Sequence, residues 1–111
     1  MTIDLDVWQT ASRFGLDPLL LQAVVQAEGD ILKAVQCSMP SVTTREQALD
    51  ITARSAVHAM SDFLTVDGSR YAFVLFWAKR WAPVGAVNDP KSLNANWPTN
   101  VAKGWGLTLP V

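Results

Sequence analysis

The chain has 111 residues, half of them hydrophobic, and a formal net charge of −1. This length and composition predict one domain, residues 1–111, built around one core. Without a basic surplus, nucleic acid and anionic membranes are not expected partners. The single cysteine, Cys37, excludes an internal disulfide and a cysteine-based metal cluster, and no metal or other cofactor is expected.

The N-terminal sequence MTIDLDVW has no basic region followed by an apolar run, so we expect synthesis in the cytoplasm without a signal peptide. The longest apolar run, 71–78, is too short to cross a bilayer, and no membrane insertion is expected. Apolar residues recur at helical spacing over 3–14, and Gly15 would end that helix. We expect this first helix to serve packing rather than chemistry.

The stretch DPLLLQAVVQAEG, residues 17–29, predicts a helix that carries a carboxylate on its apolar face. Asp17 is a favourable N-cap, and Gly29 is a favourable stop. At 100° per residue, the apolar stripe contains Leu21, Val24, Val25 and Glu28. Gln22 falls on the opposite face. Partial burial disfavours the charged form of a carboxyl group, and a protonated Glu28 would suit a general acid for glycoside cleavage. Alternatively, Glu28 turns to solvent or pairs with an arginine.

The same stretch resembles the soluble lytic transglycosylase domain, which is lysozyme-like, through its helix of the form D-P-x-L-L-x-A-V-V-x-x-E. The matching residues are Asp17, Pro18, Leu20, Leu21, Ala23, Val24, Val25, Glu28 and Gly29. Residues 80–101 are similar to the ending of small lysozyme-like proteins of tailed bacteriophages. The resemblance implies that Glu28 is catalytic. The family's G-L-M-Q and Y-N-A-G elements are absent from this chain.

Residues 30–37 predict a short helix. By position, the resemblance makes Gln36 and Ser38 candidates for holding the reacting sugar, although both also suit ordinary loop and cap roles. Glycosidases with two acids place them about 5 Å or ~6.5–9.5 Å apart. The sequence does not fix the direction of Asp30, and no other carboxylate stands out as a partner of Glu28. This favours the single-acid mechanism of the transglycosylases, in which the substrate's own 6-hydroxyl attacks and a 1,6-anhydro product forms.

Residues 44–64 predict the longest helix, which is amphipathic and begins with a capping box of Thr44 and Gln47. The only histidine, His58, lies near the middle of its polar face. A lone histidine is a poor metal site, so we expect a solvated position, with a cleft-lining role as the alternative.

Residues 69–82 predict a helix that is apolar nearly all round, a pattern typical of a buried centre. Its aromatic residues are mostly expected in the core, although one or two at its end could reach a cleft. The segment 83–100 predicts a loop, and 98–105 a last short helix. Asn94, Asn96 and Trp97 suit sugars, because amides bond hydroxyl groups in two directions and indole rings stack on pyranoses. Turn chemistry and one core tryptophan are the alternative. With Tyr71, these three complete the candidate glycan contacts.

The predicted fold is all-α, a compact lysozyme-like domain of about five helices around a buried central helix, 69–82. The function implied is cleavage of the β-1,4 bond between N-acetylmuramic acid and N-acetylglucosamine by a lytic transglycosylase or muramidase, with Glu28 as general acid and base. Peptidoglycan strands are the expected partner. Other phage particle subunits are a further possibility, and a phage particle or a membrane lesion would deliver the protein to the cell wall. The alternatives are a non-catalytic structural or adaptor component of a virion, and a glycan-binding module.

Overall fold

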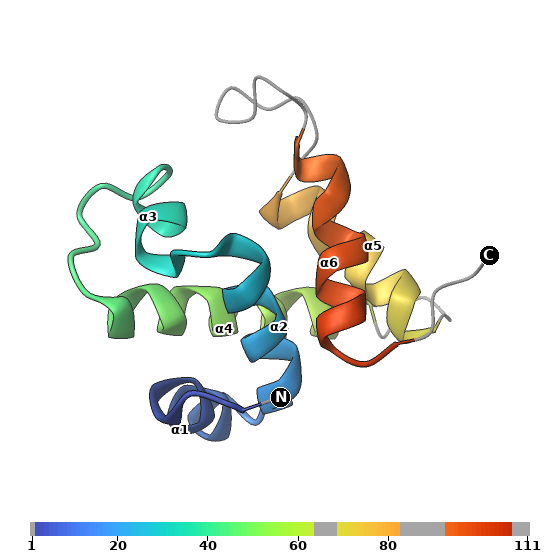
Figure 1. Ribbon diagram of the computed structural model, residues 1–111, viewed down its shortest axis with the longest axis horizontal. Coiled ribbons are helices and arrows are strands. Elements are labelled where there is room, and N and C mark those ends of the chain that lie inside the picture. Colours follow the sequence, from blue (N-terminus) through green and yellow to red (C-terminus); the bar gives the residue numbers. More distant parts are fainter. Residues whose placement is uncertain (1, 64–68, 83–92, 108–111) are drawn as a thin grey trace.

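The computed structural model describes residues 2–63, 69–82 and 93–107, and this part of the chain contains helices and no strand (Figure 1). The elements are α1 (Leu5–Phe14), α2 (Pro18–Glu28), α3 (Ile31–Gln36), α4 (Arg45–Phe63), α5 (Arg70–Trp81), the 3-10 helix η1 (Leu93–Asn96) and α6 (Trp97–Gly104). The predicted all-α fold is confirmed. Among the described helices, none combines the length and the apolar character needed to cross a membrane.

Local side chains set the helix ends at the places where the sequence predicts them. The Asp17 carboxylate accepts a hydrogen bond from the backbone N–H of Leu19 at the start of α2. Gly29 follows the last residue of α2 with φ 77°, a backbone angle that favours glycine. At α4, Thr44 and Gln47 exchange two hydrogen bonds of 3.2 Å, which is the predicted capping box.

The helices pack as two groups that share one core. α4 runs across the molecule and packs against α1, α3 and α5 (Figure 1). α2 packs chiefly against α6, and the two helices run in opposite directions (Figure 1). Close approach of this pair depends on small residues, because Gly104 of α6 lies directly against Ala23 of α2. The end of α2 is thereby held beside the beginning of α6.

Among the described helices, α2 is the most deeply buried. The sequence had predicted that 69–82, which forms α5, would be the buried central helix. Residues 20–25 of α2 are all buried. α5 buries one face through Phe73, Val74, Trp77 and Ala78, whereas Leu75 is 41% exposed. Gln22 accounts for part of this difference. It was expected on an opposite, polar face, but it is 4% exposed, and its Oε1 accepts a hydrogen bond from the Asp4 backbone N–H at 3.1 Å.

The predicted loop over 83–100 is wrong from Leu93 onward, because η1 and α6 occupy that part. Trp97, Val101 and Trp105 recur every four residues and give the segment a buried helical face. The last short helix predicted over 98–105 is therefore confirmed, with an earlier start. Residues 83–92 lie outside the described part of the chain.

Candidate functional site

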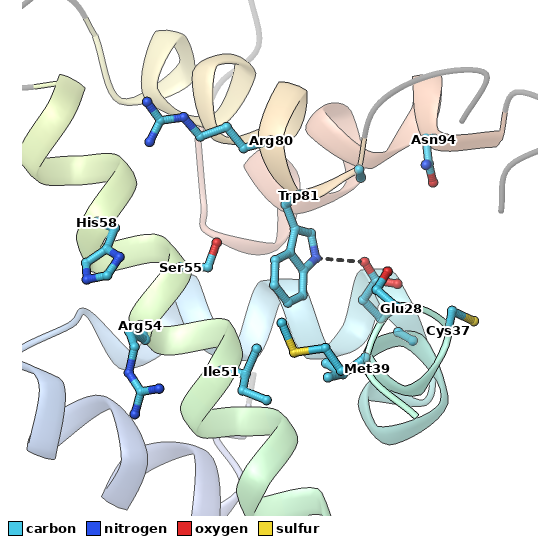
Figure 2. Close-up of a pocket in the computed structure, with 14 residues that line it drawn as sticks. Glu28, Cys37, Met39, Ile51, Arg54, Ser55, His58, Arg80, Trp81 and Asn94 are labelled. Atoms are coloured by element: carbon cyan, nitrogen blue, oxygen red, sulfur yellow. Dashed lines mark hydrogen bonds between the residues drawn. The ribbon is translucent and has the colours of Figure 1, made fainter. Parts of the chain in front are cut away.

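The carboxylate of Glu28 is fixed by two tryptophan side chains. Glu28 is the last residue of α2 and is half-buried. Its Oε1 accepts a hydrogen bond from Nε1 of Trp97 at 2.8 Å and another from Nε1 of Trp81 at 3.3 Å, the second of which is drawn in Figure 2. Both hydrogen bonds reach the same oxygen, and Oε2 receives none from the described residues. The carboxyl group is thus oriented through one oxygen.

Three helices meet at this carboxylate. Trp81 is the last residue of α5, and Trp97 is the first residue of α6. The indole of Trp77, one turn before Trp81, contacts both rings, with centroids 6.0 Å from Trp81 and 5.3 Å from Trp97. Trp77 is itself fully buried and donates its Nε1–H to Ser55 of α4 at 2.9 Å. The packing of Trp77 therefore restrains both indoles that hold Glu28.

A cavity of about 670 Å³ opens beside Glu28, within the size range of small-ligand sites. It lies where the ends of α2 and α5 meet α3, the middle of α4 and η1. Its apolar lining consists of Ala34, Val35, Met39, Ile51, Trp81 and Ala82, its polar lining of Glu28, Cys37, Ser38, Ser55 and Asn94, and its basic side chains are Arg54, His58 and Arg80. This mixture of apolar surface and polar or charged groups suits an amphipathic ligand such as a sugar.

Three predicted site residues, Glu28, Ser38 and Asn94, line this cavity together. Gln36 is close to Ser38 in sequence, but it does not line the cavity. Its Nε2 donates a hydrogen bond to the backbone oxygen of Val42 at 2.9 Å. That bond holds the turn between α3 and α4. Gln36 therefore supports the wall of the cavity.

Trp97, Asn96 and Tyr71 do not line the cavity in the described structure. Trp97 is 5% exposed, and its Nε1 donates a hydrogen bond to Glu28. Because protein covers its ring, Trp97 does not offer a face on which a sugar could stack. Asn96 occupies the N-cap of α6 and is exposed. Tyr71 lies in the first turn of α5, ten residues before Trp81, which places it about 15 Å away along the helix.

The sequence analysis missed most of the α4 and α5 contribution to the cavity. Arg54 and His58 of α4 and Arg80 of α5 all line it, as does Trp81. For His58, the sequence offered cleft lining as the alternative to a solvated position, and it allowed one or two aromatic residues at the end of 69–82 to reach a cleft, as Trp81 does. The positions of Arg54 and Arg80 at the cavity were not predicted. Periodicity identifies the polar face of a helix, but it does not reveal which other helix encloses that face.

Glu28 is the single carboxylate among the described residues that line the cavity. Asp30 accepts a hydrogen bond from the Lys33 backbone N–H and caps α3. Asp62 forms an ion pair with Arg80 at 2.7 Å. Within the described ranges, no three histidine, cysteine or acidic side chains gather as a metal site.

Comparison with known proteins finds no family model, no curated protein and no solved structure that matches this chain.

Proposed function

We propose that this protein is a glycosidase that cleaves the β-1,4 bond between N-acetylmuramic acid and N-acetylglucosamine in peptidoglycan, with Glu28 as general acid and base. The observation that carries the proposal is the carboxyl group of Glu28, clamped through Oε1 at the wall of a cavity of about 670 Å³. The resemblance of residues 17–29 to the lytic transglycosylase helix also supports it.

The two indoles determine which oxygen of Glu28 carries the transferred proton. Two N–H donors take up the lone pairs of Oε1, so the proton of the neutral acid resides on Oε2. Glu28 gives that proton to the glycosidic oxygen as the bond to the sugar carbon breaks. The resulting carboxylate then accepts the proton of the attacking hydroxyl, which restores the acid.

The absence of a second carboxylate among the described lining residues favours an attack from within the substrate. Glycosidases with two acids use the second one as nucleophile or to activate water. In a transglycosylase the 6-hydroxyl of the same muramic acid attacks, and Glu28 alone serves both proton transfers. The muramidase route, with water as nucleophile, is the runner-up within the same proposal.

Three cavity residues are proposed to hold the glycan. The hydroxyl of Ser38 and the amide of Asn94 are suited to sugar hydroxyl and acetamido groups. The half-buried ring of Trp81 offers apolar surface to a pyranose. A phage particle or a membrane lesion would bring the protein to the cell wall.

The test compares Glu28→Gln with Asp17→Asn, a matched carboxylate-to-amide change at the other end of α2. Asp17 also accepts an indole N–H, from Trp105 at 3.0 Å, but it does not line the cavity. Glutamine at position 28 keeps one oxygen for both indole hydrogen bonds, whereas asparagine at position 17 keeps one of the two acceptors that serve Trp105 and the Leu19 backbone N–H. We expect wild type and Asp17→Asn to clear a peptidoglycan suspension, and Glu28→Gln to lose about 10²–10⁴-fold in rate.

Mass spectrometry of the released fragments identifies the nucleophile. Fragments with 1,6-anhydro ends would establish the transglycosylase route, whereas reducing ends would make water the nucleophile and keep Glu28 as the acid. Failure of the wild-type protein to clear any of several cell walls would overturn the enzyme proposal, as would equal clearing by Glu28→Gln.

A second candidate function is a structural or adaptor component of a virion. The observation that favours it is the exposure of Leu5 and Trp8 on α1, at 72% and 52%. Large apolar side chains one turn apart suit a surface that a partner subunit covers. Sedimentation over a range of concentrations tests this candidate. Self-association that Trp8→Gln abolishes, in a protein that clears no cell wall, would favour it.

A further inference from the structure

The charged groups of the cavity are distributed unevenly. Arg54 and His58 of α4 and Arg80 of α5 lie on one side of the close-up, Glu28 lies on the other, and Trp81 stands between them (Figure 2). We call these three basic side chains the basic edge. With Arg54 and Arg80 each +1 and Glu28 −1, the described lining carries +1, whereas the whole chain carries −1. The cavity is therefore more positive than the protein around it.

The residues of the basic edge differ in how far the protein neutralises them. Arg80 is paired with Asp62 at 2.7 Å, and its guanidinium lies over the Phe76 ring at 4.6 Å. Arg54 forms no ion pair with any described carboxylate, and its guanidinium carbon lies over the Phe14 ring, 6.0 Å from the ring centroid. An arginine without an acidic partner keeps its forked donors available for an oxyanion.

We propose that the basic edge, with Arg54 as its main donor, binds a carboxylate carried by the glycan in the cavity. This deepens the proposed function, because it assigns a charged substituent to the substrate. Two forms of a peptidoglycan strand supply that chemistry. Where muramic acid bears no peptide, its lactyl group is a free carboxylate; where a stem peptide is attached, the lactyl carboxyl is an amide and the acidic groups of the peptide supply the charge. A neutral glycan of N-acetylglucosamine alone has no such group and would leave the basic edge without a partner.

The test measures binding by calorimetry in the Glu28→Gln protein, which prevents turnover. Three tetrasaccharides are compared: neutral N-acetylglucosamine, peptide-free strand with muramic acid, and the same strand bearing stem peptides. We expect at least one anionic probe to bind about fivefold more tightly than the neutral one, as for one exposed ion pair, and the advantage to shrink at high salt. The better of the two anionic probes identifies the source of the carboxylate.

Arg54→Gln, in the same background, is expected to remove that advantage, so that the anionic and neutral probes bind with equal affinity. Lys79→Gln is the matched control, since it removes one positive charge from an exposed site on α5 that does not line the cavity. It should retain the advantage. Arg54→Lys, which keeps the charge but loses the fork, should retain part of it.

The outcomes separate this inference from the proposed function. Cleavage of peptidoglycan together with equal binding of neutral and anionic probes would overturn the inference alone. A preference for anionic probes that depends on Arg54, in a wild-type protein without cleavage, would support the inference and overturn the enzyme. Binding of none of the three probes would overturn the inference, as would an identical effect of Arg54→Gln and Lys79→Gln.

Discussion

Two carboxylates at opposite ends of α2 accept indole N–H groups, and they differ in what else they face. Asp17 receives its hydrogen bond from Trp105 and also caps the helix. Glu28 receives two, from Trp81 and Trp97, and in addition lines the cavity. The contact at Asp17 shows that such a pair is an ordinary way to satisfy a buried indole. The combination of the same contact with the cavity is particular to Glu28.

This dual position leads to a prediction about stability. Glu28→Ala removes the acceptor of two indole donors, one of them on the nearly buried Trp97, whereas Glu28→Gln retains an acceptor oxygen. We expect Glu28→Ala to lower the free energy of unfolding by about 1–3 kcal/mol relative to Glu28→Gln. Urea denaturation measures the difference. Equal losses in both variants would mean that the negative charge, not the acceptor, stabilises the site.

The residue types of the site were predictable, and their partners were not. Glu28 was identified from its position on the apolar stripe and from the family resemblance. Trp97 and Gln36 were predicted to touch sugar, yet their polar atoms bind Glu28 and the Val42 backbone. A single sequence shows that Trp97 carries a donor. It does not show that a carboxylate 69 positions earlier accepts from it.

At the level of elements, the packing of α2 on α6 positions Glu28. A Cβ atom built on Gly104 would lie 2.9 Å from Cβ of Ala23 and 3.2 Å from its Cα, so the two helices touch through their backbones there. The close approach places Trp97 beside Glu28 and Trp105 beside Asp17. The start of α6 thus contacts the end of α2, and the end of α6 contacts the start of α2, so the two helices run antiparallel.

Substitution of Gly104 tests this contact. A glycine-to-alanine change in a helix usually stabilises by up to about 1 kcal/mol, but here the added methyl group meets Ala23. We expect Gly104→Ala to lower the free energy of unfolding by about 1–3 kcal/mol, as overpacking does. Addition of Ala23→Gly should restore part of the loss, and the exposed Lys103→Ala is the control. Stabilisation by Gly104→Ala would contradict the close packing.

The helices themselves were largely predictable because their ends are determined locally. Asp17, the Thr44–Gln47 box and Ser69 occupy capping positions that their side chains favour, and Gly29 ends α2 with a positive φ that suits glycine. The error at 93–97 arose because many asparagines and a proline suggested a loop. Proline in the first turn of α6 instead begins a helix, where its missing N–H is not needed.

At the level of the whole molecule, α1 is joined to the rest partly through exposed ion pairs. Arg45, at the start of α4, binds Asp6 at 2.7 Å and Asp4 at 2.9 Å. Arg13 of α1 binds Asp50 of α4 at 2.7 Å. The hydrogen bond with Asp6 is the main cause of a raised pKa for the Arg45 guanidinium. These contacts involve none of the residues that line the Glu28 cavity.

We therefore expect Arg45→Gln to loosen α1 without changing the cavity. The loss of stability should stay below about 1 kcal/mol and shrink at high salt, because all three side chains are partly exposed. Since the raised pKa belongs to a cation, its contribution is present below the unfolded-state pKa and is lost only in strongly alkaline solution.

Hydrogen exchange and thermal melts measure these effects. Faster exchange in α1 alone is expected, with a smaller effect for Arg13→Gln, which breaks one pair instead of two. Uniformly faster exchange across all six helices would show that these ion pairs support the whole fold.

The cavity is the feature that the sequence reveals least. It depends on α3 and α5 meeting different parts of α4, and hydrophobic periodicity contains no information about that placement. His58 is an example. It is exposed, as its position on the polar face of α4 predicts, and it also lines the cavity.

The sharing of Glu28 Oε1 by two indoles has an evolutionary consequence. Selection for folding requires only an acceptor at position 28, which glutamine provides as well as glutamate does. Selection for proton transfer requires the acid. On the proposed function, glutamine at this position in related chains would mark lineages that retain the fold and have lost cleavage. Glutamate that never varies at position 28, beside asparagine and aspartate that interchange at position 17, would record continued selection on the reaction itself.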